Sequence, residues 1–346
     1  MLQAFARLAG VLAQILYTAA DKAEILALLK TLELETSDTG PFVILRRNRG
    51  ALLRRPRTGG IEVVASGRAD WVGSLELRTE PVNAIGMRST ARVIADLGAD
   101  VLGVVEAENR PALTAFNAAL LPSAGGEAYA QVMLIDGNDA RGIDVGLMTR
   151  PGFAIGRMRS HVDDRSAGDG GIDDLPIFSR DCPEYEVTTP NGNALLVLVN
   201  HFKSKSGNQT TGNRLRKAQA DRVRAIYEQR RAEGVDNIAI IGDLNDSPGS
   251  APLRGLLTET DLRDISAHAN FGDGGFPGTF GSSSAANKID YILLSPALFA
   301  RTTGGGIFRM GMWPGVRPAK WPVFPEITRP VEAASDHGAI FADIDI

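Results

Sequence analysis

The chain has 346 residues, of which 44% are hydrophobic and 23% are charged, so it is long and apolar enough to bury a sizeable core. Its formal net charge of −4 excludes a globally basic protein that coats nucleic acid, although a local basic patch remains compatible with it. The single cysteine, Cys182, excludes an intrachain disulfide framework and suits a reducing compartment, so we expect a cytoplasmic protein.

The N-terminal segment predicts two short helices. Residues 1–35 carry apolar side chains at helical spacing, and Asp21 with Glu24 resembles a capping box at the start of the second helix. A signal peptide is the alternative for the first twenty residues, but no basic segment precedes the apolar run and Arg7 interrupts it. No apolar run approaches the roughly 18–20 residues of a membrane span.

A turn-rich stretch at residues 35–41 then predicts a boundary. We expect a helical extension at residues 1–38 and one large domain at residues 39–346, because no linker-like stretch interrupts the second part. The sequence leaves the role of the helical extension and the oligomeric state open.

Beyond this boundary the pattern changes to short apolar runs, which predict strands. They lie at residues 42–47, 61–66, 71–77, 100–106, 131–135, 144–150, 194–202, 238–241, 289–294 and 337–346. Helices are expected at residues 89–98 and 213–232. Because several strands are apolar throughout, other layers should cover both of their faces, and this favours an α/β sandwich.

Polar side chains stand at the ends of these strands, where an isolated charge would be costly unless it is paired or bound to metal. They are Glu106, Asn200, His201, Asp243, Asn245, Asp290, Asp336 and His337. Carboxylates with an amide oxygen suit a hard ion such as Mg²⁺, with Mn²⁺ as the alternative. The sequence has no glycine-rich phosphate loop and no nucleophile elbow, and two histidines beside a hard metal fit metal-assisted phosphoester hydrolysis.

The motifs VVEAEN, VNHFKSK, IIGDLND, NKIDYILLS and ASDHGAI occur in this order, and their approximate spacing resembles that of the endonuclease/exonuclease/phosphatase superfamily. This metal-dependent fold is shared by deoxyribonuclease I, exonuclease III, sphingomyelinases and inositol phosphatases. The resemblance covers about residues 42–346. It implies a deoxyribonuclease I-like, four-layered α/β/β/α sandwich with the active site at one edge.

The resemblance also implies roles for individual residues. Glu106 is expected to be the main metal ligand and Asp336 a second acidic ligand, direct or through water. Asp243 is expected to position or deprotonate the attacking water. Asn245 would hold that water or a phosphate oxygen, and it can shape the turn at the same time.

Two histidines complete the expected catalytic set. His337 would donate to a phosphate oxygen and pair with Asp290, which would favour the imidazolium form and fix the ring. His201 would bind the phosphate from the other side. The remaining histidines, His161 and His268, lie in polar or turn-rich stretches, and we expect both to be solvated.

Four further assignments rest on the resemblance. The family places an Asn at the end of its first strand. We favour Asn48 over Asn83 for this position, and the choice of Asn48 requires an inserted hairpin at residues 50–82. Arg180 is expected to contact phosphate and Asp181 to be a partner of His201, with a plain surface salt bridge as the alternative. Lys203, in VNHFKSK, is expected to bind substrate.

Local charge and aromatic residues bear on the substrate. Two basic segments favour nucleic acid, with a solvated charge run as the alternative. They comprise Arg46, Arg47, Arg49, Arg54, Arg55 and Arg57, and then Lys203, Lys205, Arg214, Arg216, Lys217 and Arg222. Trp313, Trp321 and Phe324 lie in a proline-rich loop that either contacts substrate or packs on itself. We therefore expect a Mg²⁺-dependent nuclease acting on DNA or RNA, with a phosphatase or phospholipid phosphodiesterase as the alternative and a non-catalytic binding module as a third reading.

Overall fold

The structure is a computed structural model of the chain. It describes residues 2–40, 43–56, 59–77, 83–139, 142–166, 175–205, 208–315 and 319–346. The chain divides into two compact units, Met1–Val82 with Asp136–Ile143 and Asn83–Ile135 with Asp144–Ile346. The division after residue 82 differs from the boundary expected after residue 38, because the first strands join the N-terminal helices.

The first unit packs two helices on small antiparallel sheets. Its elements are α1 (Leu2–Leu12), α2 (Ala19–Thr31), β1 (Val43–Gly50), β2 (Leu53–Arg54), β3 (Glu62–Val63) and β4 (Trp71–Leu77), with β1 paired to β4 and β2 to β3. Helix α2 begins at a capping box formed by Thr18 and Asp21, one turn earlier than the sequence indicated. Leu8 and Leu12 of α1 are buried with Ile25 of α2, so the apolar face of α1 belongs to the core of this unit.

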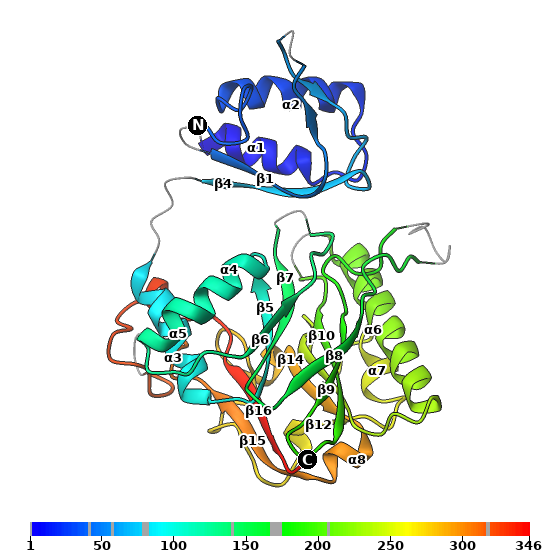
Figure 1. The fold of residues 1–346 in the computed structure, drawn as a ribbon, viewed down its shortest axis with the longest axis vertical. Coiled ribbons are helices and arrows are strands. Elements are labelled where there is room, and N and C mark those ends of the chain that lie inside the picture. Colours follow the sequence, from blue (N-terminus) through cyan, green and yellow to red (C-terminus); the bar gives the residue numbers. More distant parts are fainter. Residues whose placement is uncertain are drawn as a thin grey trace. The chain divides into compact units, whose positions relative to one another are not determined.

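The second unit is built on a six-stranded sheet (Figure 1). Its order is β12 (Arg263–Asp264), β14 (Asp290–Leu294), β11 (Ile238–Asp243), β10 (Ala194–His201), β9 (Glu184–Thr188) and β8 (Ala154–Arg159). Strands β10 and β11 run parallel, and the other pairs are antiparallel. Helix α6 (Gln209–Ala232) covers one face of this sheet, where Val223 and Ile226 pack with Leu198 and Ile240.

Two three-stranded sheets complete the β-structure of this unit. One has the order β5 (Val101–Ala107), β7 (Asp144–Thr149) and β6 (Gln131–Leu134), and the other β13 (Phe271–Gly272), β15 (Thr302–Phe308) and β16 (Ala339–Ile344). Val145 and Leu147 of β7 pack with Val197 and Val199 of β10, so two sheets meet face to face.

Helices cover the outer face of the β5–β7–β6 sheet. They are α3 (Ala84–Leu97), α4 (Arg110–Ala115), a π-helical turn (Phe116–Leu120) and α5 (Leu121–Ser123). Two other short helices, α7 (Arg254–Leu257) and α8 (Pro296–Phe299), lie elsewhere in this unit. Ile94 of α3 and Leu113 of α4 share a buried cluster with Leu102 and Met148. The layers therefore run helix, sheet, sheet, helix, which confirms the predicted α/β/β/α sandwich.

Strands β5 and β16 are edge strands of their three-stranded sheets. Within the described residues, β5 pairs only with β7, and β16 pairs only with β15. A cavity of about 770 Å³ is lined by residues 101–105 and 338–346 of these two strands, together with Ile241 from the six-stranded sheet and Ile94 from α3. Asp290 and His337 also line it, so the cavity reaches the edge of the sandwich where the polar side chains gather.

Some strands were not predicted because their sequences lack an apolar signal. Strand β15 reads TTGGGIF, and glycine disfavours strands when no packing compensates. Here the packing requires glycine, because a Cβ on Gly305 would lie 2.6 Å from the carbonyl oxygen of Phe341. Among the described residues, no helix has both the length and the apolar character needed to cross a membrane.

Candidate active site

Three neighbouring strands bring three predicted residues into one row. His201 on β10 lies opposite Asp243 on β11, and Asp243 lies opposite Asp290 on β14. Directly opposed residues on adjacent strands project to the same face, so the register alone gathers these side chains. Each of these residues is predicted at a strand end from the sequence, and the pairing of β10, β11 and β14 makes them neighbours.

Asp243 is the buried member of this row, with 5% of its surface exposed. Burial, followed by the negative charge of Asp290, raises its pKa from the ordinary value of 3.8 to about 7. The backbone N–H of Asn245 donates to Oδ1 of Asp243 at 2.7 Å, and Nδ2 of Asn245 donates to Oδ2 at 2.8 Å. Asn245 adopts a left-handed φ of 53°, which Asn tolerates better than most residues, and the turn thereby fixes the orientation of the carboxylate.

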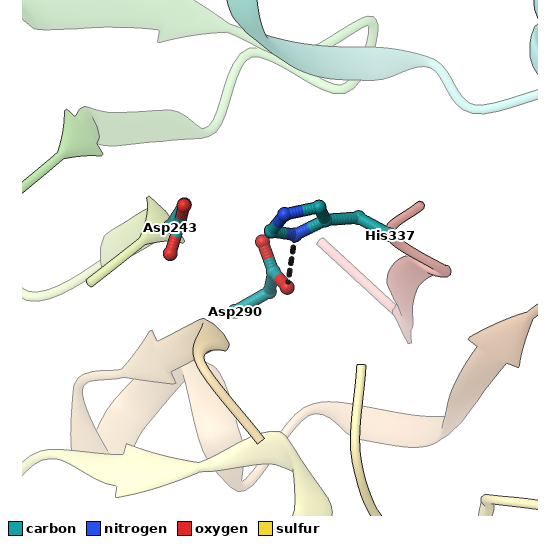
Figure 2. Close-up of side chains that lie close together, drawn as sticks. All are labelled: Asp243, Asp290 and His337. Atoms are coloured by element: carbon teal, nitrogen blue, oxygen red, sulfur yellow. Dashed lines mark hydrogen bonds and ion pairs between the residues drawn. The ribbon is translucent and has the colours of Figure 1, made fainter. Parts of the chain in front are cut away.

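His337 and Asp290 form the second pair of the site (Figure 2). Nδ1 of His337 donates to Oδ2 of Asp290 at 2.9 Å, and the ring of Phe280 lies 4.9 Å from the imidazole ring. Burial lowers the pKa of His337, but the hydrogen bond and charge of Asp290, with smaller contributions from Asp243 and Asp336, outweigh it and raise the pKa to about 9. At neutral pH this imidazole is therefore a cation that can donate a hydrogen bond from Nε2.

His201 lies on the other side of Asp243, with its Nε2 3.7 Å from Oδ2 of that carboxylate. The same nitrogen lies 3.4 Å from Nη2 of Arg180, whose side chain is 2% exposed. Arg180 Nη1 also donates to the carbonyl oxygen of Phe202 at 3.4 Å. The predicted phosphate contact Arg180 thus stands directly beside the predicted phosphate contact His201.

Glu106 reaches the site from the facing sheet. Its Oε1 lies 4.0 Å from Nε2 of His201, and its side chain is 57% exposed. The residue sits in an irregular step of the β5–β7 pairing and has a φ of 62°. A left-handed conformation at a residue other than glycine costs on the order of 1–3 kcal/mol, and such strain is concentrated at functional sites.

Two sets of residues offer ligands for a metal ion. Glu106 and Asp336 are exposed carboxylates, and such hard oxygen donors suit Mg²⁺. Asp243, Asp290 and His337 each place one ligand atom within 4.8 Å of the others. The first set holds the two acidic ligands expected from the sequence, and this assignment stays a prediction.

The two candidates for the first-strand asparagine lie in different units. Asn48 is on β1 of the first unit. Asn83 is in the second unit, where its Oδ1 accepts from the N–H groups of Ile85 and Gly86 at the start of α3 and its Nδ2 donates to the carbonyl oxygen of Val331. Asn83 is thus tied to the segment that leads to Asp336, and the role of Asn48 stays a prediction.

Asp181 accepts hydrogen bonds from backbone groups, and the side chain of Lys203 contacts the neighbouring Ser204. Oδ1 of Asp181 accepts from the backbone N–H of His161 at 2.7 Å and of Cys182 at 2.8 Å, and burial raises the pKa of this carboxyl. Nζ of Lys203 donates to Oγ of Ser204 at 3.3 Å. Their expected roles, at His201 and at the substrate, stay predictions.

The expectation that His161 is solvated was wrong. The residue is 8% exposed, and its ring contacts Asp164 at 2.9 Å and Glu184 at 3.0 Å. Glu184 also accepts two hydrogen bonds from Arg230, at 2.6 and 2.7 Å. No sequence pattern connects these partners, because they come from a loop, β9 and α6. His268, in contrast, is partly exposed and lies edge-on to Phe299 with 5.6 Å between ring centroids.

Asp246, in the turn after β11, forms ion pairs that connect this turn to neighbouring segments. It is 5% exposed and accepts from Nε of Arg216 at 2.9 Å and Nζ of Lys205 at 2.8 Å. Arg216, 1% exposed, also donates to the carbonyl oxygens of Lys203 and Ser204. The turn after β11 and the segment after β10 are therefore tied to α6, which holds the strand ends in place.

The comparisons with known proteins agree with this architecture. Residues 81–337 match the sequence profile of the Endonuclease/Exonuclease/phosphatase family. This match includes Asn83 but not Asn48, and it includes every other predicted site residue. A search of curated proteins finds no match.

Solved structures show the same fold at low sequence identity. The mannosyl-6-phosphatase of Bacteroides thetaiotaomicron is 17% identical with a TM-score of 0.54, and the match covers 76% of this chain and 92% of that one. Sphingomyelinase C of Streptomyces griseocarneus is 18% identical with a TM-score of 0.50, over 75% and 92% of the two chains. An endonuclease/exonuclease/phosphatase of Bacteroides vulgatus is 14% identical with a TM-score of 0.50, over 75% and 91%. With its sandwich fold and its row of strand-end acids and histidines, the chain belongs to the Endonuclease/Exonuclease/phosphatase family of phosphoester hydrolases.

Proposed function

We propose that this chain is a divalent-metal-dependent phosphodiesterase and that nucleic acid is its substrate. The observation that carries the hydrolytic activity is the row of His201, Asp243 and Asp290, extended by the hydrogen bond from His337 to Asp290. It places a carboxylate of raised pKa between two imidazoles. Such a set can accept a proton from water and donate hydrogen bonds to a phosphate.

The reaction starts with Asp243. At pH values above its pKa of about 7 the carboxylate is ionised and accepts a proton from a water molecule held beside Asn245. The water oxygen forms a bond to phosphorus while the ester bond on the opposite side breaks. A carboxyl group with a pKa close to the working pH suits this role, because it combines basicity with the ionised state.

Hydrogen-bond donors on both sides stabilise the negative charge that develops on the phosphate oxygens. The imidazolium of His337 donates from Nε2 on one side, and His201 with the adjacent guanidinium of Arg180 acts on the other. Glu106 and Asp336 would hold a divalent cation, which would supply Lewis-acid stabilisation of the leaving oxygen when bound. We propose Asn83 rather than Asn48 as the amide near this cation, because only Asn83 falls within the family match.

The charges around the site bear on which phosphoester is cleaved. Nucleic acid requires cations that are available to the phosphate backbone. Arg180 contacts His201, and Lys203 follows His201 by two positions in the sequence. Arg214 lies on the N-terminal half of α6. These residues, together with the sequence motif VNHFKSK, support a nuclease.

Ion pairs favour a second candidate, a phosphatase acting on a small phosphoester. In the basic segment around α6, Lys205 and Arg216 bind Asp246, Lys217 binds Asp221 and Arg222 binds Asp164. In the N-terminal unit Arg46, Arg54 and Arg55 pair with Glu76, Glu62 and Asp38. Much of the positive charge that the sequence offered to a polynucleotide is thus neutralised within the protein.

One assay separates these candidates. Plasmid DNA, RNA, a generic phosphodiester and p-nitrophenyl phosphate are each incubated with the wild type in Mg²⁺ and in EDTA. We expect Mg²⁺-dependent cleavage of a polynucleotide that is lost in Asp243→Ala and retained in Asp221→Ala, a control that removes an exposed carboxylate on α6. Turnover of the monoester alone would replace the nuclease with the phosphatase, and no metal-dependent turnover of any phosphoester would refute the enzymatic proposal.

A further inference from the structure

A second cavity of the catalytic unit, which we call the Trp pocket, lies beside the proposed metal ligand Asp336. Its volume is about 330 Å³. Its lining includes Trp313, Pro314, Lys320, Trp321, Pro330 and Asp336. Among the described residues that line it, most side chains are flat or apolar, and Lys320 and Asp336 carry the charges.

The tryptophan wall is held rigidly in place. Trp321 is 8% exposed, and its Nε1 donates to the carbonyl oxygen of Met312 at 2.9 Å. The ring of Phe276 packs against it edge-on, with 5.3 Å between ring centroids. Arg309, itself 7% exposed, donates to the carbonyl oxygens of Asp273 and Gly278 on either side of Phe276. The Trp321 side of the pocket is therefore preformed, which lowers the entropic cost of binding a ligand there.

One short segment joins the Trp pocket to the catalytic groups. Met312 forms an isolated bridge with Ser335, which lines both the Trp pocket and the cavity that contains Asp290. Asp336 then lines the Trp pocket, and the next residue, His337, hydrogen-bonds Asp290. A substrate whose phosphate contacts His337 can therefore place its esterified group in the Trp pocket.

We propose that the Trp pocket binds the nucleobase next to the scissile phosphate, with the base stacked on Trp313. This inference rests on the proposed phosphodiesterase function and names the part of the substrate that the site recognises. Trp313 is only half-buried, unlike Trp321, so its ring is accessible from the cavity that it lines. Stacking on an aromatic side chain accepts every base, because each base has a π-face.

The chemistry of the walls disfavours two other groups. The hydroxyls of a sugar each need a polar partner, and Trp313, Trp321, Pro314 and Pro330 mainly offer apolar surface. A quaternary ammonium headgroup would be attracted by the tryptophans and by the carboxylate of Asp336, but it would be repelled by the cation of Lys320, whose Nζ is held by the carbonyl oxygen of Ser282 at 3.0 Å. A base carbonyl can accept a hydrogen bond from the same lysine.

The first test compares two p-nitrophenyl diesters, thymidine 5′-(p-nitrophenyl phosphate) and methyl p-nitrophenyl phosphate, which differ in the base-bearing group. We expect Trp313→Ala to lower kcat/KM for the thymidine ester by about 5- to 150-fold, mainly through KM, and to change it less than about twofold for the methyl ester. Trp313→Phe, which keeps a ring, should restore most of the loss. Val331→Ala, which shortens an exposed side chain near this segment, is the matched control.

The second test measures binding without turnover, so that a failure of the pocket and a failure of the enzymatic proposal can be told apart. By calorimetry, thymidine 5′-monophosphate should bind the wild type at least about fivefold more tightly than 2-deoxyribose 5-phosphate, and Trp313→Ala should remove this difference. Equal losses on both diesters, no loss on either, or tighter binding of the sugar phosphate would each overturn the nucleobase assignment. Preferential turnover of p-nitrophenyl phosphocholine would overturn it in favour of a lipid headgroup.

Discussion

The imidazole of His337 donates from Nδ1 to Oδ2 of Asp290 at 2.9 Å and so connects the segment before β16 to the first residue of β14. These two residues are far apart in the sequence: Asp290 belongs to the six-stranded sheet, and His337 lies just before a strand of another sheet. Asp290 in turn stands opposite Asp243 in the β11–β14 pairing. The carboxylate of Asp290 thus raises the pKa of the proposed base, Asp243, and the pKa of the proposed hydrogen-bond donor, His337.

This shared carboxylate predicts the pH profile. Asp243 must be ionised, above about pH 7, and His337 protonated, below about pH 9, so kcat/KM should be bell-shaped with a maximum near pH 8. In Asp290→Asn the negative charge that raises both pKa values is gone, and both limbs should move to lower pH. A pH series with saturating Mg²⁺ measures this, and a shift of only one limb would show that Asp290 acts on one partner.

The ionised form of Asp243, which the reaction requires, should lower the stability of the fold. Because folding raises its pKa from 3.8 to about 7, the stability linked to this group is present at low pH and is lost as the pH rises through about 7. Asp243→Asn should therefore abolish activity, by about 100-fold or more, and raise the Tm by at least about 3 °C at pH 8 in EDTA. At pH 4 the two proteins should differ much less, and an equal gain at both pH values would contradict the linkage.

Glu106 should control the metal requirement. Glu106→Gln removes a charge from the exposed carboxylate beside His201, and we expect the Mg²⁺ concentration for half-maximal activity to rise about tenfold or more. Glu108→Gln, two residues further along and also exposed, should leave the Mg²⁺ titration unchanged. An unaltered titration in Glu106→Gln would exclude it as a ligand, even if the rate fell.

The buried Glu184–Arg230 pair should matter for stability and leave the chemistry unaffected. Glu184 is fully buried, and Glu184→Gln leaves the Arg230 cation with less compensation, so the free energy of unfolding should fall by about 3 kcal/mol in urea at pH 7. Glu186→Gln, which breaks the exposed pair with Arg159, should cost less than about 1 kcal/mol. Activity per folded molecule should be unchanged in both.

The same pair predicts an acid limit for the fold. Burial alone would raise the pKa of Glu184, but hydrogen bonds from Arg230 and His161 outweigh it and lower the pKa from 4.5 to about 2. The stability that this carboxylate contributes is therefore present above about pH 4.5 and is lost as the pH falls toward 2. The wild type should lose more stability than Glu184→Gln over this interval, as measured by urea unfolding at each pH.

The order of motifs was sufficient to predict the fold and to name residues that the structure brings together, because each motif combines a buried strand with a polar residue at its end. The strands before Glu106, His201 and Asp243 are local apolar runs, and a sandwich requires such runs to be covered on both faces. The helix that leads from Asn83 toward Glu106 begins earlier than its apolar periodicity indicated, because the asparagine caps it. The glycine-rich β15 gave no signal, since its requirement for glycine arises from a facing strand.

Residue types and their strand positions can be read from the sequence: acids, amides and histidines stand at strand ends, in the order of one family's motifs. Which charged groups become neighbours depends on the tertiary structure. His161 is buried between Asp164 and Glu184. Lys205 and Arg216 form ion pairs with Asp246. Trp313 and Trp321 line a pocket beside Asp336. A residue type and its strand position are local properties, whereas an ion pair or a pocket depends on the register and packing of segments that are distant in the chain.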